Sequence, residues 1–321
     1  MKNIVLICTH NGEKFIKEQI YSIIDQSKKV DYIYIFDFNS QDKTKSIILD
    51  IKKTAFSNIY LKEHDYAPGA CLSFFTAFQY LKEKVKDDDC IFIADQDDVW
   101  LPHKVLSIEE LFNQEYKKSR NQKILIFHDV KIVDENLNII EDTFYTKNTY
   151  YIPRDLSKDR LILCNCAIGH TMAISGKMLK KSASMITPHF YMMHDWALIL
   201  WASRFANITY MNSPLSLYRQ HSNNILGTRK KLGFKDRVKR TRKFTINIFH
   251  QTKNFYFDLK NNISYKKISL FDKIMFLIAH KNTPKFILWL TLSMLSLFRG
   301  PTIKRKLISI IFIANIFNHD K

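Results

Sequence analysis

A buried strand that runs straight into an acidic loop is encoded by Cys90-Ile91-Phe92-Ile93-Ala94-Asp95-Gln96-Asp97-Asp98-Val99-Trp100-Leu101-Pro102. The apolar run has the length and composition of a strand that is covered on both faces of a sheet. Three carboxylates then follow within four residues, and such crowding of like charge is unfavourable unless a cation or solvent offsets it. Hard divalent ions such as Mg²⁺ or Mn²⁺ take carboxylate oxygens as ligands and share them with a diphosphate. The segment therefore predicts either a metal site or a solvated acidic turn, and the flanking strand favours the metal site.

The residues before this segment alternate between strand-like and helix-like patterns. Short apolar runs predict strands at Ile4–Cys8, Tyr32–Phe36 and Asn58–Leu61. Helical spacing of apolar residues predicts helices over 15–24, from 42 to about 54, and over 71–82. This alternation is typical of an α/β fold, with a mostly parallel sheet and helices on both faces. Ligands of such sheets lie beyond the carboxyl ends of the strands, where the polar turns Thr9–Gly12 and Asp37–Asp42 are expected.

After about Lys123 the pattern changes. Strands are predicted at Ile124–Phe127, Val130–Val133 and Leu215–Tyr218, and a turn followed by a strand at Asn136–Ile140. Ile168–Ile174 is a further apolar run. Helices are predicted at Gly176–Met185 and Trp196–Phe205. We expect this half to complete the site by covering its second side.

The positive charge of the chain is concentrated toward its C-terminal end. The 321 residues carry a formal net charge of +18, and residues 228–321 hold 21 Lys or Arg against 4 Asp or Glu. Residues 1–227 hold 28 basic and 27 acidic side chains and are nearly neutral. We therefore predict a globular domain over 1–227 and a basic, helical region over 228–321. A basic block of this kind usually meets phosphate, either in nucleic acid or on an anionic membrane.

Two apolar runs, Phe286–Phe298 and Leu307–Phe317, lie within this basic region. Neither reaches the roughly 20 residues that a bilayer-spanning helix needs. Amphipathic helices lying on an anionic membrane surface are predicted instead, and packing on the globular domain or on a partner subunit is the alternative. The N-terminal residues lack the apolar core of a signal peptide, and five irregularly spaced cysteines indicate free thiols. The prediction is a cytoplasmic protein that lies peripherally on the inner face of the cell membrane.

Further polar residues follow or begin predicted elements. Asp195, in His194-Asp195-Trp196, is either a first-turn acid favoured by the helix dipole or a general base that takes a proton from a hydroxyl. Arg219 and His221 follow the last predicted strand and are candidates for holding phosphate oxygens and a metal ion, respectively. Gly169 suggests a close backbone approach.

Taken together, these motifs resemble family 2 glycosyltransferases with the GT-A fold, over about residues 1–230. The likeness is greatest to bacterial rhamnosyltransferases that build cell-wall and capsular polysaccharides. The residues that carry it are Thr9-His10-Asn11-Gly12-Glu13-Lys14-Phe15, Asp95-Gln96-Asp97-Asp98-Val99-Trp100-Leu101-Pro102, Gly169-His170-Thr171, His194-Asp195-Trp196 and Tyr218-Arg219-Gln220-His221 with Asn224 and Gly227.

The resemblance implies an inverting, metal-dependent sugar transfer. Asp195 would be the base on the acceptor hydroxyl. The metal ion, Mg²⁺ or Mn²⁺, would be held by Asp97, Asp98 and His221. The residues implied to bind the nucleotide sugar are Thr9, His10, Asn11, Asp37, Asp95, Gln96, Trp100, Gly169 and Arg219. The implied donor is dTDP-rhamnose, and the implied acceptor is a growing polysaccharide or a lipid-linked oligosaccharide.

The sequence departs from the family pattern at the expected base-binding residues. The family usually has a second Asp where Phe38 stands and Tyr where His10 stands, and the stretch Tyr66–Phe74 lacks two Asn residues that are common in close relatives. These departures keep a transferase of another hexose from a UDP-sugar open as an alternative. A degenerate, non-catalytic homologue is a further one.

Two other classes of protein also use some of these features. The basic region would suit a nucleic-acid-binding protein, but its basic blocks alternate with aliphatic runs rather than with stacking aromatics. Nucleotidyltransferases also place carboxylates after a strand, but they would be expected to carry a Gly-rich basic loop near the N-terminus. No such loop appears in this sequence.

Overall fold

The acidic segment is anchored by strand β4 (Cys90–Ala94), which pairs in parallel with β1 (Asn3–Thr9) in this computed structural model. On the other side of β1 lie β2 (Tyr32–Phe38) and then β3 (Ile59–His64), also in parallel. The prediction of a parallel sheet for the first half is therefore confirmed. The structure describes residues 1–67, 69–119, 122–145, 156–221, 234–263, 269–279, 287–288, 290–292 and 294.

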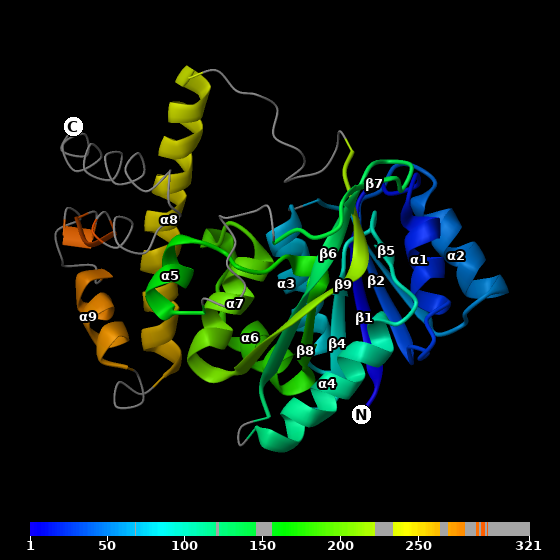
Figure 1. Ribbon diagram of the computed structural model, residues 1–321, viewed down its shortest axis with the longest axis horizontal. Helices are drawn as coiled ribbons and strands as arrows, with labels where there is room; N and C mark the ends of the chain where they lie inside the picture. Colours follow the sequence, from blue (N-terminus) through cyan, green and yellow to red (C-terminus); the bar gives the residue numbers. More distant parts are fainter. Residues whose placement is uncertain are drawn as a thin grey trace.

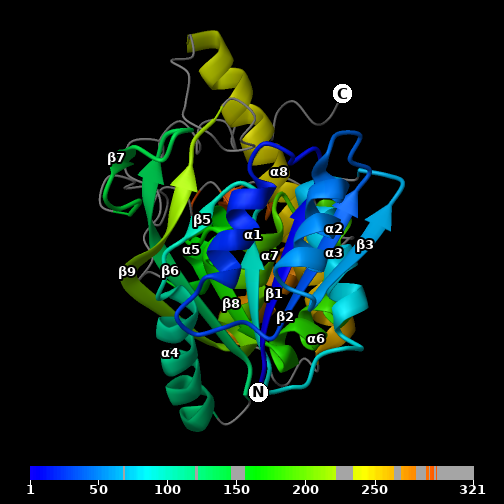
Figure 2. The ribbon, with the colours of Figure 1, turned by 90° about the vertical axis from the view of Figure 1, so that its right-hand side faces the viewer.

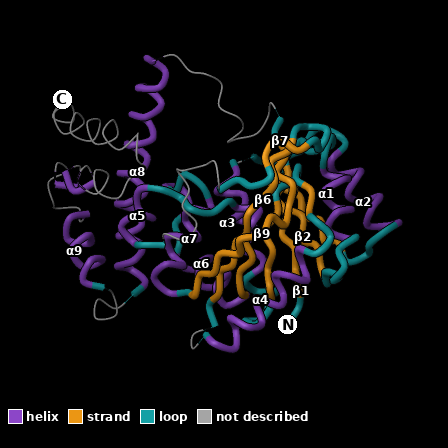
Figure 3. The backbone as a smooth tube through the Cα atoms, in the orientation of Figure 1, coloured by secondary structure: helices purple, strands orange, loops and turns teal. Residues whose placement is uncertain are grey.

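The second half of the chain extends the same sheet with strands of mixed direction. They are β8 (Met172–Ser175), β6 (Ile124–Val133), β9 (Asn207–Arg219) and β5 (Val99–Trp100), with β7 (Ile139–Glu141) paired to β6. The strand order is β3-β2-β1-β4-β8-β6-β9-β5. The β4–β8, β8–β6 and β9–β5 pairs are antiparallel, and the β6–β9 pair is parallel. The strands lie together as one layer in Figure 3, which confirms the predicted mixed α/β sheet.

Helices cover both faces of the sheet because successive strand residues point to opposite faces. Val5 and Ile7 of β1 belong to one apolar core, and Ile4 and Leu6 belong to the other. The first core is covered by α1 (Ile16–Ile24), α2 (Thr44–Thr54) and α4 (Lys104–Lys118). The second is covered by α3 (Ala70–Leu81), α6 (Gly176–Met185) and α7 (His194–Phe205). Figures 1 and 2 show these two layers from directions at right angles.

The C-terminal helices extend the α7 side of the molecule. They are α8 (Phe234–Asn262) and α9 (Leu270–Ala279), and the short α5 (Lys158–Leu163) lies near them. Phe255 and Leu259 of α8 are buried in the same core as α7. Within the described ranges, no helix combines the length and apolar character that crossing a membrane requires. The apolar runs Phe286–Phe298 and Leu307–Phe317 fall mostly or wholly outside those ranges.

Some elements differ from the predictions. The two strands predicted at 124–127 and 130–133 form one strand, β6, whose register with β9 shifts at the buried polar pair His128 and Asp129. The apolar run at 168–174 begins with a 3-10 turn, Gly169–Thr171, and then continues as β8. Helices α4 and α5 were not predicted. The polar residues at the β6 bulge made one strand look like two, because they interrupt the apolar pattern.

Candidate active site

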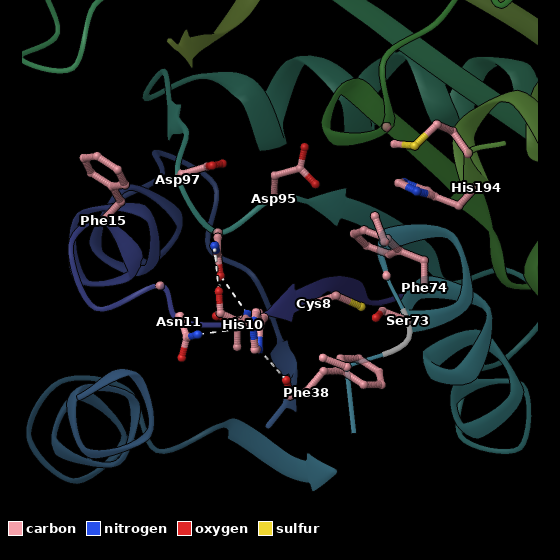
Figure 4. Close-up of a pocket in the computed structure, with 18 of the residues that line it drawn as sticks. Cys8, His10, Asn11, Phe15, Phe38, Ser73, Phe74, Asp95, Asp97 and His194 are labelled. Carbon is pink, nitrogen blue, oxygen red and sulfur yellow. Dashed lines mark hydrogen bonds between the residues drawn. The ribbon is translucent and has the colours of Figure 1, made fainter. Parts of the chain in front are cut away.

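A cavity of about 650 Å³ lies at the carboxyl ends of β1, β2 and β4. Its wall is completed by the start of α3, the Gly169 turn, the start of α7 and the end of β9. Figure 4 shows Asp95 and Asp97 on one side of this cavity, with His10 and Phe38 across from them. The sequence placed the polar turns on this edge of the sheet, and the structure brings them together around one space.

Gln96 joins the acidic loop to the first turn of the chain. Its Oε1 accepts hydrogen bonds from Thr9 Oγ1 at 2.6 Å and from the His10 backbone N–H at 2.9 Å. Gly12 makes this packing possible, because a Cβ added there would lie 2.6 Å from Gln96 Oε1. Asn11 adopts the left-handed conformation with φ of 48°, and its backbone N–H donates to Ser40 Oγ at 2.8 Å. The first turn is therefore held from both neighbouring strand ends.

Asp97 and His221 meet at the acidic side of the cavity. Asp97 Oδ2 lies 2.9 Å from His221 Nε2, and the His221 ring is 4.8 Å from the ring of Phe15. Both Asp97 and His221 line the cavity. Desolvation and the neighbouring Asp98 raise the pKa of the Asp97 carboxyl, and its bond to His221 acts in the opposite direction. This pair therefore places a carboxylate and an imidazole at the wall of the cavity.

Asp98 faces the interior instead of the cavity. Its carboxylate is buried, contacts His170 Nδ1 and accepts a hydrogen bond from the Arg219 backbone N–H at 3.1 Å. Burial raises the pKa of Asp98 to about 7 and lowers that of His170 to about 4. The three residues predicted to hold the metal are therefore split: Asp97 and His221 reach the cavity, whereas Asp98 is turned behind them.

The donor groups present fit a divalent cation. Among the described residues, one group with ligand atoms within 4.8 Å of one another consists of Asp95, Asp98 and His170. Of these three residues, Asp95 lines the cavity, and burial together with the nearby Asp98 and Asp97 carboxylates raises its pKa to about 7. Carboxylate oxygens and imidazole nitrogens are ligands that Mn²⁺ accepts, and a cation would relieve the mutual repulsion of these acids.

Asp195 lies in the first turn of α7 and lines the same cavity. Its Oδ1 accepts the Trp196 backbone N–H at 2.5 Å, and its Oδ2 accepts the Gly169 N–H at 3.1 Å. Burial raises the pKa of Asp195 to about 7, even though these hydrogen bonds favour the charged form. A carboxylate with a pKa near neutrality, fixed at the wall of a cavity, has the properties of a general base.

Gly169 approaches the active-site wall as the sequence suggested. A Cβ at this position would collide with the ring of His194, which is itself stacked on Phe74 with 3.9 Å between ring centroids. The Gly169 turn is therefore packed directly against the residue that precedes Asp195.

Three residues predicted to touch the nucleotide sugar do not line the cavity. Asp37 is buried and accepts the Ser40 N–H at 3.0 Å, so it shapes the loop after β2. Trp100 is buried against Phe92, with 5.7 Å between their rings. The third is Arg219, whose role differs most from the prediction.

Arg219 was expected to hold phosphate oxygens, but its guanidinium is buried against protein. Its Nε donates to the Asp97 carbonyl at 2.8 Å, one Nη donates to the Glu135 carbonyl at 2.6 Å, and the other contacts the Glu18 carboxylate. A buried guanidinium must satisfy its donors locally. The structure therefore assigns Arg219 to holding the acidic loop in place.

Lys104 lies directly behind the acidic loop, which its sequence context does not indicate. It is buried, its Nζ donates to the His170 carbonyl at 2.9 Å, and it lies 4.0 Å from the centre of the Trp100 ring. Burial lowers the pKa of Lys104 to about 7, whereas the nearby Asp98 and Asp95 carboxylates act to raise it. In a chain with 49 Lys and Arg, no local signal distinguishes this one, because its burial depends on the packing of α4 behind the site.

A mixed sheet of this order, with an acidic cavity at the ends of its parallel strands, is the arrangement of the GT-A fold. The model of the family described as Glycosyl transferase family 2 matches residues 4–175, and the chain belongs to this family.

Several known proteins are similar to this chain. It is 27% identical over 250 residues to the dTDP-rhamnosyl transferase RfbG of Shigella flexneri, across 73% of this chain and 77% of that one. It is 28% identical over 181 residues to an uncharacterized glycosyltransferase of Methanocaldococcus jannaschii, across 55% and 57%. The crystal structure of S. aureus TarS 1-349 in complex with UDP-GlcNAc superposes with a TM-score of 0.60 at 14% identity, across 99% of this chain and 89% of that one. This last likeness concerns the fold.

Proposed function

We propose that this family 2 glycosyltransferase moves rhamnose from dTDP-rhamnose to a hydroxyl of a growing polysaccharide or lipid-linked oligosaccharide, with inversion at the sugar carbon. The choice of donor is supported by the similarity to a dTDP-rhamnosyl transferase across most of both chains. Transfer of another hexose from a UDP-sugar is the alternative, because Phe38 takes the place of a base-binding acid in this family.

One observation carries the proposal: Asp195 and the Asp97–His221 pair line the same cavity. An inverting transfer needs a base for the acceptor hydroxyl and a separate group that accommodates the departing diphosphate. The cavity contains both kinds of group on different elements, at the start of α7 and at the ends of β4 and β9. Its volume of about 650 Å³ is in the range of sites for small-molecule substrates.

In this mechanism Asp195 takes the proton of the acceptor hydroxyl through a carboxylate oriented by the Gly169 and Trp196 N–H groups. Thr9, His10, Asn11 and Gln96 hold the nucleotide beside Asp95. A divalent cation held by Asp97 and His221 would offset the negative charge on the departing nucleotide diphosphate. Asp98, His170 and Arg219 support the loop that carries these groups.

The decisive experiment is a donor screen on the purified chain. Hydrolysis and binding of dTDP-rhamnose, UDP-hexoses and GDP-hexoses would be measured with Mn²⁺, with Mg²⁺ and with a chelator. We expect turnover of dTDP-rhamnose that requires the metal. Equal or greater turnover of a UDP-sugar would show that dTDP-rhamnose is not the preferred donor. Full turnover in the presence of chelator would show that the reaction does not require a metal ion.

Asp195→Asn tests the base within the same assay. The amide keeps the shape of the side chain but cannot take a proton, so we expect transfer to fall by about 100-fold or more while binding of dTDP with Mn²⁺ stays unchanged. Asp142→Asn is a matched control, because this acid is exposed on the surface. Normal transfer by the Asp195→Asn enzyme would rule out Asp195 as the base.

We further propose that residues 1–227 form the catalytic domain and that the basic region 228–321 holds the enzyme at the inner face of the cell membrane. A lipid-linked acceptor would place the substrate there. The positive charge of this region supports attachment to an anionic surface.

A further inference from the structure

The outward side of α9 is apolar, and its inward side is held to the rest of the protein by buried ion pairs. Asp272 is buried on the inner side, where it pairs with Arg204 at 3.0 Å and with Lys158 Nζ at 3.2 Å. Leu270, Ile274 and Leu277 lie on the side of α9 opposite Asp272 and are 74%, 49% and 59% exposed. Their spacing of i, i+4 and i+7 puts them on one side of the helix. Such a row of large exposed aliphatic side chains marks an interaction surface.

The neighbouring helix α8 carries basic residues along its length. One side of α8 is formed by residues that recur at helical spacing, namely Lys239, Lys243, Lys253 and Phe257. Phe257 is 55% exposed. Lys260 Nζ lies 5.3 Å from the ring centre of Phe276 on α9, so the two helices are in contact at this end. Figure 1 shows α9 beside α8 on the side of the molecule away from the sheet. We call the exposed faces of these two helices the α8–α9 face.

Acidic side chains of these two helices mostly point inward. Asp258 is buried and accepts hydrogen bonds from Thr187 N–H at 2.9 Å and Thr187 Oγ1 at 2.8 Å. Asp272 is buried in its ion pairs. In the described part of α8 and α9, Asp236 is the acid left at the surface. The described outward charge of these two helices is therefore positive.

We infer that the α8–α9 face is the surface by which this enzyme docks on an anionic lipid bilayer. Aliphatic side chains beside lysines match the two parts of such a membrane, because the acyl boundary takes the apolar groups and the anionic headgroups take the cations. The inference rests on the proposed membrane attachment, and it assigns that attachment to particular residues within the described structure. It is independent of which sugar the enzyme transfers.

The test is sedimentation of the full chain with vesicles of phosphatidylcholine, alone or with about 30% phosphatidylglycerol, at several salt concentrations. We expect binding to the anionic vesicles that weakens as salt rises. The variant Leu270→Gln/Ile274→Gln/Leu277→Gln should bind at least about tenfold more weakly, since three aliphatic side chains that would insert into the bilayer are lost. Lys239→Glu/Lys243→Glu should lose most of the preference for anionic lipid.

A matched control replaces equally exposed aliphatics elsewhere, in Leu49→Gln/Ile139→Gln/Ile140→Gln. It should bind like the unaltered protein. If the α9 variant binds as well as the control, the α8–α9 face is not the docking surface. Binding to RNA without binding to vesicles, or a dimer that the α9 substitutions convert to monomer, would likewise overturn the proposal. Hydrolysis of the sugar donor in solution should be equal in all variants, which separates this test from that of the catalytic proposal.

Discussion

Asp195 combines a structural position with the properties of the proposed general base. As a first-turn acid of α7 it is favoured by the helix dipole, and two backbone N–H groups fix its carboxylate. Burial acts against its charge and raises its pKa to about 7. The two interpretations of this residue from the sequence are therefore compatible, because the position that anchors the side chain also gives it a pKa suited to proton transfer.

The raised pKa of Asp195 leads to a pH prediction. The base must be ionised to act, so kcat/KM should rise with pH and level off above about pH 8, and it should fall about tenfold per unit well below pH 7. The affinity for dTDP with Mn²⁺ should be measured over the same pH range. A change in that affinity would report ionisation of Asp95 or Asp98, and not of Asp195. A flat rate profile between pH 6 and 8, with donor binding constant, would contradict the role of Asp195.

Gly169 provides a steric test of the same position. Its Cβ in Gly169→Ala would collide with the ring of His194, which cannot move freely because it is stacked on Phe74. We expect Asp195 to be displaced and kcat to fall by about 100-fold. In Gly12→Ala the collision is with Gln96, at 2.6 Å, so the main loss should be in donor affinity. Steady-state kinetics with varied donor concentration distinguish the effect on kcat in Gly169→Ala from the effect on KM in Gly12→Ala. If both variants changed kcat and KM equally, these separate roles of the two glycines would be contradicted.

At the scale of helices and strands, most elements of the first hundred residues could be predicted because each has an uninterrupted pattern. β4 begins and ends where the sequence indicated, and α6 also matches its prediction. The site was less predictable. Asp97 and His221 lie 124 residues apart, and only the pairing of the strands decides that Asp97, rather than Asp98, meets His221. Likewise, the burial of Arg219 follows from contacts with three separate segments.

The attachment of α9 can be tested through its buried ion pair. Asp272→Asn would leave Arg204 and Lys158 without their counter-charge, and loss of one partner of a buried pair costs about 3–5 kcal/mol. Glu63→Gln is the control, because its ion pair with Lys45 is exposed and should contribute less than about 1 kcal/mol. Urea unfolding measures the free energy of unfolding of both variants. A loss as small as that of the control would mean that α9 is held mainly by its apolar contacts.

The pH dependence of that stabilisation has a definite sign. Burial opposes ionisation of Asp272, but Arg204, Ser269 and Lys158 together hold its pKa below the ordinary value of 3.8. The contribution of Asp272 is therefore present above pH 3.8 and is lost as the pH falls further. We expect the difference in stability between Asp272→Asn and the unaltered protein to shrink in that acidic range.

On the scale of the whole molecule, charge is distributed unevenly. Three carboxylates, those of Asp95, Asp97 and Asp195, line one cavity, and Asp98 lies buried behind them, in residues 1–227, which are nearly neutral overall. Positive charge collects on the helices at the other side. Burial raises the pKa of Asp95, Asp98 and Asp195 to about 7, and nearby carboxylates add to the shift of Asp95. A bound divalent cation would offset part of the negative charge of these acids.

A bound cation and nucleotide should therefore stabilise the entire fold. At a hundred times the Kd, a ligand that binds the native state adds about 2.7 kcal/mol of stability. Thermal unfolding should shift upward with Mn²⁺ and dTDP together, and less with either alone. Asp97→Asn should lose the joint shift because it removes a cavity-facing ligand. Asp195→Asn should retain it, because that residue acts on the acceptor. A full shift in Asp97→Asn would place the cation elsewhere, with the buried group Asp95, Asp98 and His170 as the remaining set of donors.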